Sequence, residues 1–342
     1  KTPINCPYCQ SKKTKKDGKR KGKHQTVQKY FCKDCNKNFT NKTLNHKAYP
    51  SKIILNAISQ YNLGHSQSKV SNIISSKFKT KVPQRTISQW INEYKNICTF
   101  HKLRKEAKKL YPEEEIIEQH ILMHNNLPYK FQIHKAKLHL LFHSIKYNNQ
   151  FHNISHFYGP LKAYLEKIPT NKFPHHIFTY NKEENNDQRA SQIKFKHLKI
   201  ETKSKNNLAC KLANLALNLA ATNNQNFFLI NDSTTIATEI PIYLTNWDAG
   251  YYRNQKGFIF PLNNYKTPIT GHIDILQIRN GLIHILDYKP EANKIKPIEQ
   301  LTIYALSLSR KLNLPLYHFK AAWFDESNYF EFFPLHAVYE KN

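Results

Sequence analysis

The 342-residue sequence is poor in several kinds of residue, and each shortage excludes a class of protein. Asp and Glu number only 24 against 52 Lys and Arg, which gives a formal net charge of +28. No apolar run approaches the roughly 18 residues that a transmembrane helix needs, and the polar N-terminus shows no signal peptide. Six cysteines are too few for a disulfide-stapled scaffold. We therefore expect a cytoplasmic protein, nucleoid-associated if prokaryotic.

The positive charge is concentrated near the N-terminus. Residues 1–110 hold 26 of the 52 Lys and Arg but only 4 of the 24 Asp and Glu. This asymmetry indicates a polyanionic partner for the N-terminal third, either nucleic acid or an anionic membrane. The hydrophobic fraction of 40% is enough to bury real cores, and the length suggests about two or three domains.

Two pairs of cysteines share the spacing Cys-x-x-Cys. Cys6 and Cys9 form the first pair, Cys32 and Cys35 form the second, and 22 residues separate the pairs. Zn²⁺ prefers four soft ligands in a tetrahedron, which two such hairpin tips supply. A redox role fits two copies around a basic stretch poorly, and an iron–sulfur site is not excluded by the spacing. We expect a structural Zn²⁺ with no catalytic role, because four thiolates leave no open position for a substrate.

The stretch between the cysteine pairs is strongly basic, with Asp17 as its only acid. Its basic residues are Lys12, Lys13, Lys15, Lys16, Lys19, Arg20, Lys21, Lys23 and Lys29. A solvated charge run is the alternative, but we expect these side chains to contact phosphates. CPYC, a basic stretch with Gly18 and KYFCKDCNKNF together resemble the zinc ribbons of insertion-sequence transposases, in which Tyr30, Phe31 and Phe39 would pack around the metal.

Residues 51–96 are predicted to form three short helices, because apolar residues recur there at helical spacing. The order resembles a helix-turn-helix whose second helix covers about 66–78 and whose recognition helix covers about 84–95. The residues expected to reach base edges are Gln84, Arg85, Thr86, Ser88 and Gln89. The residues expected to be buried are Ile87, Trp90, Ile91 and Tyr94. A plain three-helix bundle is the alternative.

The remaining sequence predicts a helical region followed by an α/β core. Residues 112–115 are expected to start a helix, residues 115–180 to be mainly helical, and residues 181–206 to form a linker. The expected core elements are helix 208–221, strands 227–231, 236–244, 269–279 and 282–288, helix 297–311, and strands near 317–324 and 328–334. His120 and His124 would lie four residues apart on a helix, for which packing is a simpler interpretation than metal binding.

Strands 269–279 and 282–288 are predicted to pair as a hairpin around Asn280-Gly281, and they carry a group of charged residues. Asp287 and Lys289 are two residues apart and face the same side, and Asp274 lies on the partner strand. Two carboxylates and an ammonium at one place are costly unless a divalent cation or an anionic substrate completes the set. Phosphodiester hydrolysis fits this need.

The ordered set GHID, ILDYKP and QLTIY resembles the RecB-like branch of the PD-(D/E)XK nucleases over residues 208–335. The resemblance implies that Asp274 and Asp287 hold Mg²⁺ or Mn²⁺ and that Lys289 orients the attacking water. It also implies supporting roles for Gln300 and Tyr304 on helix 297–311. Glu239 is the best candidate for an additional upstream carboxylate.

These patterns predict a multidomain protein with the following parts: a zinc ribbon (1–45), a helix-turn-helix domain (46–108), a helical region with a linker (109–207) and an α/β restriction-endonuclease-like core (208–342). The expected function is a metal-dependent endonuclease for double-stranded DNA, linked to a mobile element, with no membrane partner. A homodimer would supply two active sites for two strands. The alternatives are a non-catalytic DNA-binding regulator or mobile-element accessory protein with a degenerate nuclease fold, and a nuclease acting on RNA.

Overall fold

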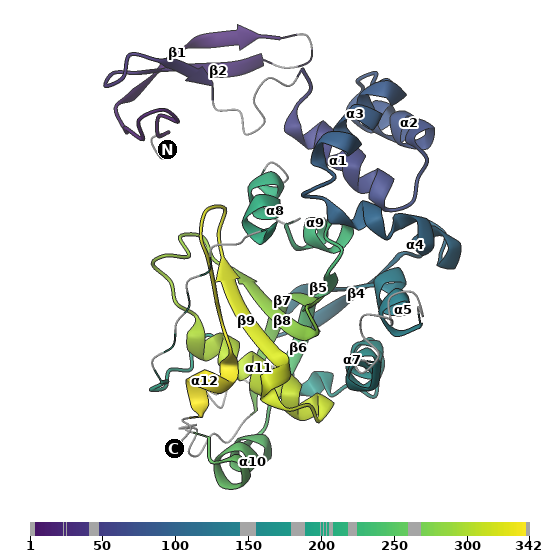
Figure 1. Cartoon of the computed structure of the whole chain (residues 1–342), viewed down its shortest axis with the longest axis vertical. Helices are drawn as coiled ribbons and strands as arrows, with labels where there is room; N and C mark the ends of the chain where they lie inside the picture. Colours follow the sequence, from purple (N-terminus) through teal and green to yellow (C-terminus); the bar gives the residue numbers. More distant parts are fainter. Residues whose placement is uncertain are drawn as a thin grey trace.

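The computed structural model describes residues 4–22, 24, 26–40, 48–143, 155–178, 189–198, 200, 202, 204, 208–217, 224–258 and 268–339. It contains a small three-stranded sheet, a group of three helices and a large mixed sheet of seven strands with helices around it (Figure 1). Across these residues, no helix is both long and apolar enough to cross a membrane. This arrangement agrees with a multidomain α/β protein.

The three-stranded sheet contains β1 (Thr14–Lys21), β2 (Thr26–Cys32) and β3 (Asn38–Thr40) in an antiparallel order. Three helices follow: α1 (Ser51–Asn62), α2 (Gln67–Phe78) and α3 (Gln84–Tyr94). Their bounds confirm the three helices predicted from apolar spacing. The turn before α3 is tied to α2, because Ser71 donates to the Val82 carbonyl at 2.5 Å.

The seven-stranded sheet has the strand order β10-β9-β8-β7-β6-β5-β4 and is antiparallel except for the pair β8–β9. Its strands are β4 (Ile117–His124), β5 (Leu127–His134), β6 (Thr235–Leu244), β7 (Ile269–Arg279), β8 (Leu282–Tyr288), β9 (Phe319–Phe324) and β10 (Tyr329–Phe332). The helices around it are α4 (Arg104–Leu110), α5 (Lys135–His143), α7 (Ser155–Lys167), α8 (Leu208–Ala216), α9 (Asn224–Asn231), α10 (Asn246–Lys256), α11 (Ile298–Leu312) and α12 (Pro334–Val338). Short 3₁₀ turns are η1 (Thr99–Lys102), η2 (His175–Phe178) and η5 (Leu316–His318).

The three N-terminal helices share a hydrophobic core with the large sheet. Side chains of α1, α2 and α3 join those of α8 and α9 and reach Ile275 on β7 and Leu286 on β8. Figure 1 shows α8 and α9 between the three helices and the sheet. A buried amide pair crosses the same contact, since Asn62 Nδ2 donates to Asn231 Oδ1 at 2.9 Å. The helices are therefore fixed against the α/β unit by both apolar and polar contacts.

The prediction that residues 115–180 are mainly helical is wrong for residues 117–134. They form the hairpin β4–β5, and Asn125 and Asn126 adopt positive φ at its turn. Residues 112–115 form a turn that leads into β4, and η1 and α4 precede this turn. His120 and His124 therefore lie on a strand. The hairpin extends the sheet through β5, which pairs with β6.

Residues 227–231 were expected to form a strand but lie in α9. Phe227 and Phe228 pack with the N-terminal helices and the sheet, and Leu229 and Ile230 are also buried, so burial overrides the β preference of these residue types. The other expected strands and helix 297–311 are confirmed within a few residues. Helix 208–221 is confirmed as far as Ala216; residues 218–221 lie outside the described residues.

Candidate functional site

The four predicted zinc ligands come together at one end of the three-stranded sheet. All four Sγ atoms lie within 4.8 Å of one another, with Cys6–Cys35 at 3.5 Å and Cys9–Cys32 at 3.6 Å. Tetrahedral bonds of about 2.3 Å would place zinc-bound sulfurs roughly 3.8 Å apart, so the cluster fits Zn²⁺. The pKa values of the thiols move in opposite directions, because a backbone hydrogen bond from Cys35 lowers the pKa of Cys32 to about 7, whereas burial raises the pKa of Cys35. Metal binding would therefore displace protons from part of the cluster.

The surroundings of this cluster agree in part with the resemblance to zinc ribbons. Tyr30 and Phe39 stack with ring centroids 5.6 Å apart and pack against the cysteines. Phe31 lies outside this apolar cluster, and Lys15 Nζ lies 5.3 Å from its ring centroid.

Most of the predicted phosphate-contacting residues lie along β1 and just before it, and Lys29 lies on β2. Most of them are exposed: Lys12, Lys13, Lys15, Lys16, Lys19, Arg20 and Lys21. Lys23 lies outside the described residues. Asp17 is paired with Lys29 at 2.8 Å, so it neutralises little of the exposed charge on β1.

Helix α3 separates its predicted DNA-facing side chains from its buried ones. Gln84, Arg85 and Gln89 are exposed, and Thr86 and Ser88 are half-buried. The side chains of Ile87, Trp90 and Tyr94 are buried, and Ile91 is partly buried. The first turns of α3 therefore present polar side chains to solvent.

Three acidic residues lie in one row across β6, β7 and β8. The paired residues on both sides place Glu239 opposite Asp274 in the β6–β7 ladder. The β7–β8 ladder begins with Ile275 opposite Leu286, so one step further Asp274 lies opposite Asp287. The β7–β8 hairpin thus brings Asp274 and Asp287 together, and the more distant β6 adds Glu239 at the neighbouring position.

Asp274 and Asp287 lie at paired positions of β7 and β8, and Asp287 Oδ2 lies 2.8 Å from Lys289 Nζ. Burial, followed by the charge of Asp287, holds the pKa of Asp274 well above its usual range. Lys289 offsets this effect only in part. Without a cation, the Asp274 carboxyl therefore favours its protonated form, and a bound divalent ion would favour the carboxylate.

Glu239 has an unusual backbone in the middle of β6, with φ of +54°. A side chain other than glycine in this region costs about 1–2 kcal/mol. Burial raises the pKa of the Glu239 carboxyl, and a hydrogen bond from Gln225 on α9 opposes that shift. The strain and the Gln225 contact are not visible in the sequence, because both depend on how β6 packs.

Gln300 and Tyr304 complete the group from α11. Gln300 Nε2 donates to the Tyr304 hydroxyl at 2.8 Å, and this hydroxyl also meets the backbone of His272. Burial raises the pKa of Tyr304, and the charges of Asp274 and Asp287 raise it further. The phenol therefore remains a neutral hydrogen-bonding group next to the carboxylates.

The carboxylate row offers hard oxygen ligands of the kind that Mg²⁺ and Mn²⁺ prefer. Its three members do not converge as the cysteines do. Among the described residues, only the four cysteines form a group of at least three ligands with all ligand atoms within 4.8 Å. Asp274 and Asp287 thus form a pair that suits a divalent cation, with Glu239 at the adjacent position of β6.

A chain of three hydrogen-bonded histidines lies beside this group. The sequence did not predict that these three residues would meet. His124 Nδ1 lies 2.7 Å from His272 Nε2, and His124 Nε2 lies 3.2 Å from His175 Nδ1. His272 also stacks on Tyr129 with ring centroids 3.6 Å apart. The histidines come from β4, β7 and the start of η2, so only the folded chain brings them together.

No protein-family model, curated protein or solved structure matches this chain. The sequence and the geometry of its residues therefore carry the functional argument.

Proposed function

We propose that the protein is a metal-dependent DNA endonuclease with its own DNA-targeting region. One observation supports this most directly: Asp274 and Asp287 lie at paired positions of β7 and β8, Lys289 Nζ lies 2.8 Å from Asp287, and Tyr304 of α11 lies beside them. PD-(D/E)XK nucleases of the RecB-like type, which the sequence resembles, use this set of residue types.

Asp274 and Asp287, with Glu239, would hold Mg²⁺ or Mn²⁺, which when bound would polarise a phosphoryl oxygen. Lys289 is partly exposed and would orient a water molecule at the edge of the pair. Tyr304 would fix the backbone at His272 and, with Gln300, limit the freedom of the carboxyl groups.

The N-terminal third would hold and select duplex DNA. The exposed basic side chains of β1 would contact phosphates, and the start of α3 would present Gln84, Arg85 and Gln89 to base edges. A structural Zn²⁺ on the four cysteines would keep β1 in position. Homodimerisation and a role in a mobile element are further parts of the proposal.

Cleavage of supercoiled plasmid and of a short duplex with Mg²⁺ or Mn²⁺ tests this function. Wild type is expected to cut both substrates, and Asp287→Ala and Lys289→Ala are expected to lose most of the activity. Lys294→Ala is the matched control, because Lys294 is an exposed lysine paired only with Glu291. Equal cleavage by wild type and both site variants would refute the proposal.

A non-catalytic DNA-binding protein with a degenerate nuclease fold is the second candidate. Two features favour it: Lys289 already pairs with Asp287, and the three carboxylates do not converge on one point. Calorimetric titration with Mn²⁺ distinguishes the two candidates. Binding that disappears in Asp287→Asn supports the nuclease, whereas no binding beyond the cysteine site supports the regulator.

A further inference from the structure

A cavity of about 240 Å³ lies where α10, the end of α11 and η5 meet. Its lining includes four aromatic rings and two cations: Tyr251, Tyr252, Phe258, Tyr317, Lys256 and Arg310. All of its lining residues are within the described part of the chain, and none of them is acidic. The cavity therefore combines flat apolar surfaces with positive charge.

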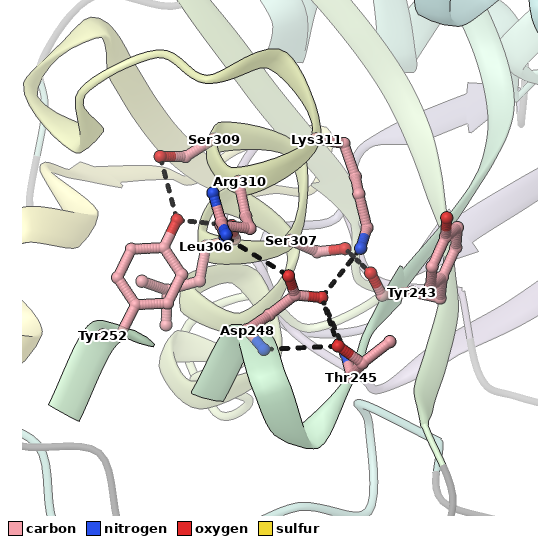
Figure 2. A network of polar contacts seen from close by, with 9 residues as sticks. All are labelled: Tyr243, Thr245, Asp248, Tyr252, Leu306, Ser307, Ser309, Arg310 and Lys311. Carbon is pink, nitrogen blue, oxygen red and sulfur yellow. Dashed lines mark hydrogen bonds and ion pairs between the residues drawn. The ribbon is translucent and has the colours of Figure 1, made fainter. Parts of the chain in front are cut away.

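Asp248 holds the cations of α11 beside this cavity (Figure 2). Its carboxylate accepts a hydrogen bond from Lys311 Nζ at 2.7 Å and lies 3.4 Å from Arg310 Nε. Thr245 caps α10 and donates to the same carboxylate at 2.8 Å. One carboxylate thus faces two cations, and the exposed Lys256 adds a further positive charge at the cavity.

The rings and the cations lie close enough to bind one ligand together. The Arg310 guanidinium lies 4.3 Å from the Tyr251 ring centroid, and Lys256 Nζ lies 5.6 Å from the same centroid. Tyr317 is 57% exposed, so its ring is accessible to a planar partner, and the His318 ring lies on it at a centroid distance of 4.4 Å. Aromatic rings that stack bases, next to cations that neutralise phosphate, are the common means of binding unpaired nucleotides.

The size of the cavity limits the ligand. Pockets for drug-sized molecules measure about 300–1,000 Å³, and this cavity is smaller. It has room for one ring system with its phosphate at the edge, whereas a base pair within a duplex keeps its ring faces stacked on its neighbours. Arg310 follows Tyr304 by six residues on α11, which is about 9 Å along the helix axis.

We propose that this cavity binds one unpaired nucleotide, with its base against Tyr317 and its phosphate at Lys256 and Arg310. The nucleotide belongs either to a single strand of nucleic acid or to a free mononucleotide, because both carry the same chemistry. Binding does not rest on the proposed nuclease activity. If a strand also meets the carboxylate row, the cavity holds it a short distance further along α11.

Photo-crosslinking of the zinc-loaded full-length protein tests the proposal. The probes are a short oligothymidylate that contains 4-thiothymidine, and free 4-thiothymidine monophosphate, both with excess unlabelled duplex to occupy the N-terminal region. Adducts are mapped by peptide mass spectrometry. We expect them on the peptides that carry Tyr251 or Tyr317. Adducts from the strand alone identify single-stranded nucleic acid as the ligand, and adducts from the mononucleotide identify a free nucleotide.

Matched variants separate stacking and charge from general effects on the fold. Tyr317→Ala is expected to reduce the adduct yield at least about fivefold, and Tyr317→Phe to restore it, because stacking needs only the ring. Lys256→Ala is expected to reduce the yield, and Lys172→Ala, an exposed lysine outside the cavity, to leave it unchanged. No adduct in the cavity from either probe, or a wild-type yield in Tyr317→Ala, overturns the proposal. Plasmid cleavage by the same variants reports separately on the nuclease function.

Discussion

Gly271 lies directly against the ring of Tyr304. A Cβ atom built on Gly271 would sit 2.5 Å from Tyr304 Cε1 and 3.0 Å from its hydroxyl oxygen. The absence of a side chain on β7 thus allows α11 to place its tyrosine beside Asp274. The close approach explains why glycine stands in the GHID segment without any need for an unusual φ.

Gly271→Ala is expected to destabilise the protein by about 1–3 kcal/mol, because the added methyl group displaces the Tyr304 ring from a packed position. Urea denaturation measures the change. In the double variant Gly271→Ala/Tyr304→Ala, the alanine at 271 is expected to cost clearly less, because the clash is gone. Additive effects of the two substitutions would contradict this explanation.

The backbone strain at Glu239 is expected to lower the stability of the folded protein. Glu239→Gly and Glu239→Ala both remove the carboxylate, but only glycine relieves the φ of +54°. The glycine variant should be more stable than the alanine variant by about 1 kcal/mol in urea denaturation. Equal stability would mean that the backbone relaxes at this position without cost.

The stability of the protein is expected to fall as the pH drops from about 6.5 to 4. Burial, followed by the nearby His175, lowers the pKa of His124 to about 4. Because the unfolded chain binds this proton at higher pH, His124 alone contributes a loss of roughly 1–3 kcal/mol as the pH falls through the window, and its stabilising contribution is fully present above the window. The lowered pKa values of His272 and His284 add losses of the same sign. Urea midpoints at both ends of the window measure the loss.

Substitution at His124 isolates its share of this pH dependence. His124→Gln should shrink the difference between the two midpoints. His120→Gln, on the same strand but paired with Glu118 and more exposed, should leave the difference unchanged. An undiminished difference in His124→Gln would assign the pH dependence to other groups.

Removal of zinc is expected to unfold the three-stranded sheet without unfolding the rest. The small core of this sheet consists of its metal-site cysteines with Ile4, Tyr30 and Phe39. The core around α1–α3 shares no residue with it, so the sheet depends on the metal separately. Elemental analysis should give one zinc per chain in wild type, one in Cys210→Ala and none in Cys9→Ser. After chelation, limited proteolysis should cut within residues 4–40 first. Simultaneous cleavage throughout the chain would contradict separate folding.

Elements with strong local signals could be predicted from the sequence. Asn280-Gly281 between two apolar strands predicted the β7–β8 hairpin, and both residues adopt the positive φ that such a turn requires. The apolar spacing of Ile87, Trp90 and Tyr94 likewise predicted the buried side of α3. From these elements the contact of Asp274, Asp287 and Lys289 could be anticipated.

Other features depend on contacts that the sequence does not encode locally. The β4–β5 hairpin carries histidines and aromatics on both sides, which conceals its alternation; Asn125-Asn126, with positive φ at both residues, was the available signal. Phe227 and Phe228 prefer strands, but α9 buries them against the N-terminal helices. The position of Glu239 depends on strain that only the completed sheet imposes.

The shared core between α1–α3 and the sheet has a geometric consequence. Since Asn62 pairs with Asn231 and apolar side chains fill the space around them, α3 and the carboxylate row keep one orientation. Under the proposed function, α3 contacts certain bases and the carboxylate row cuts one bond. The fold therefore sets a fixed number of base pairs between those bases and the cut. A flexible tether would instead scatter cuts over many positions. Mapped cleavage ends should fall at one spacing from the bound sequence.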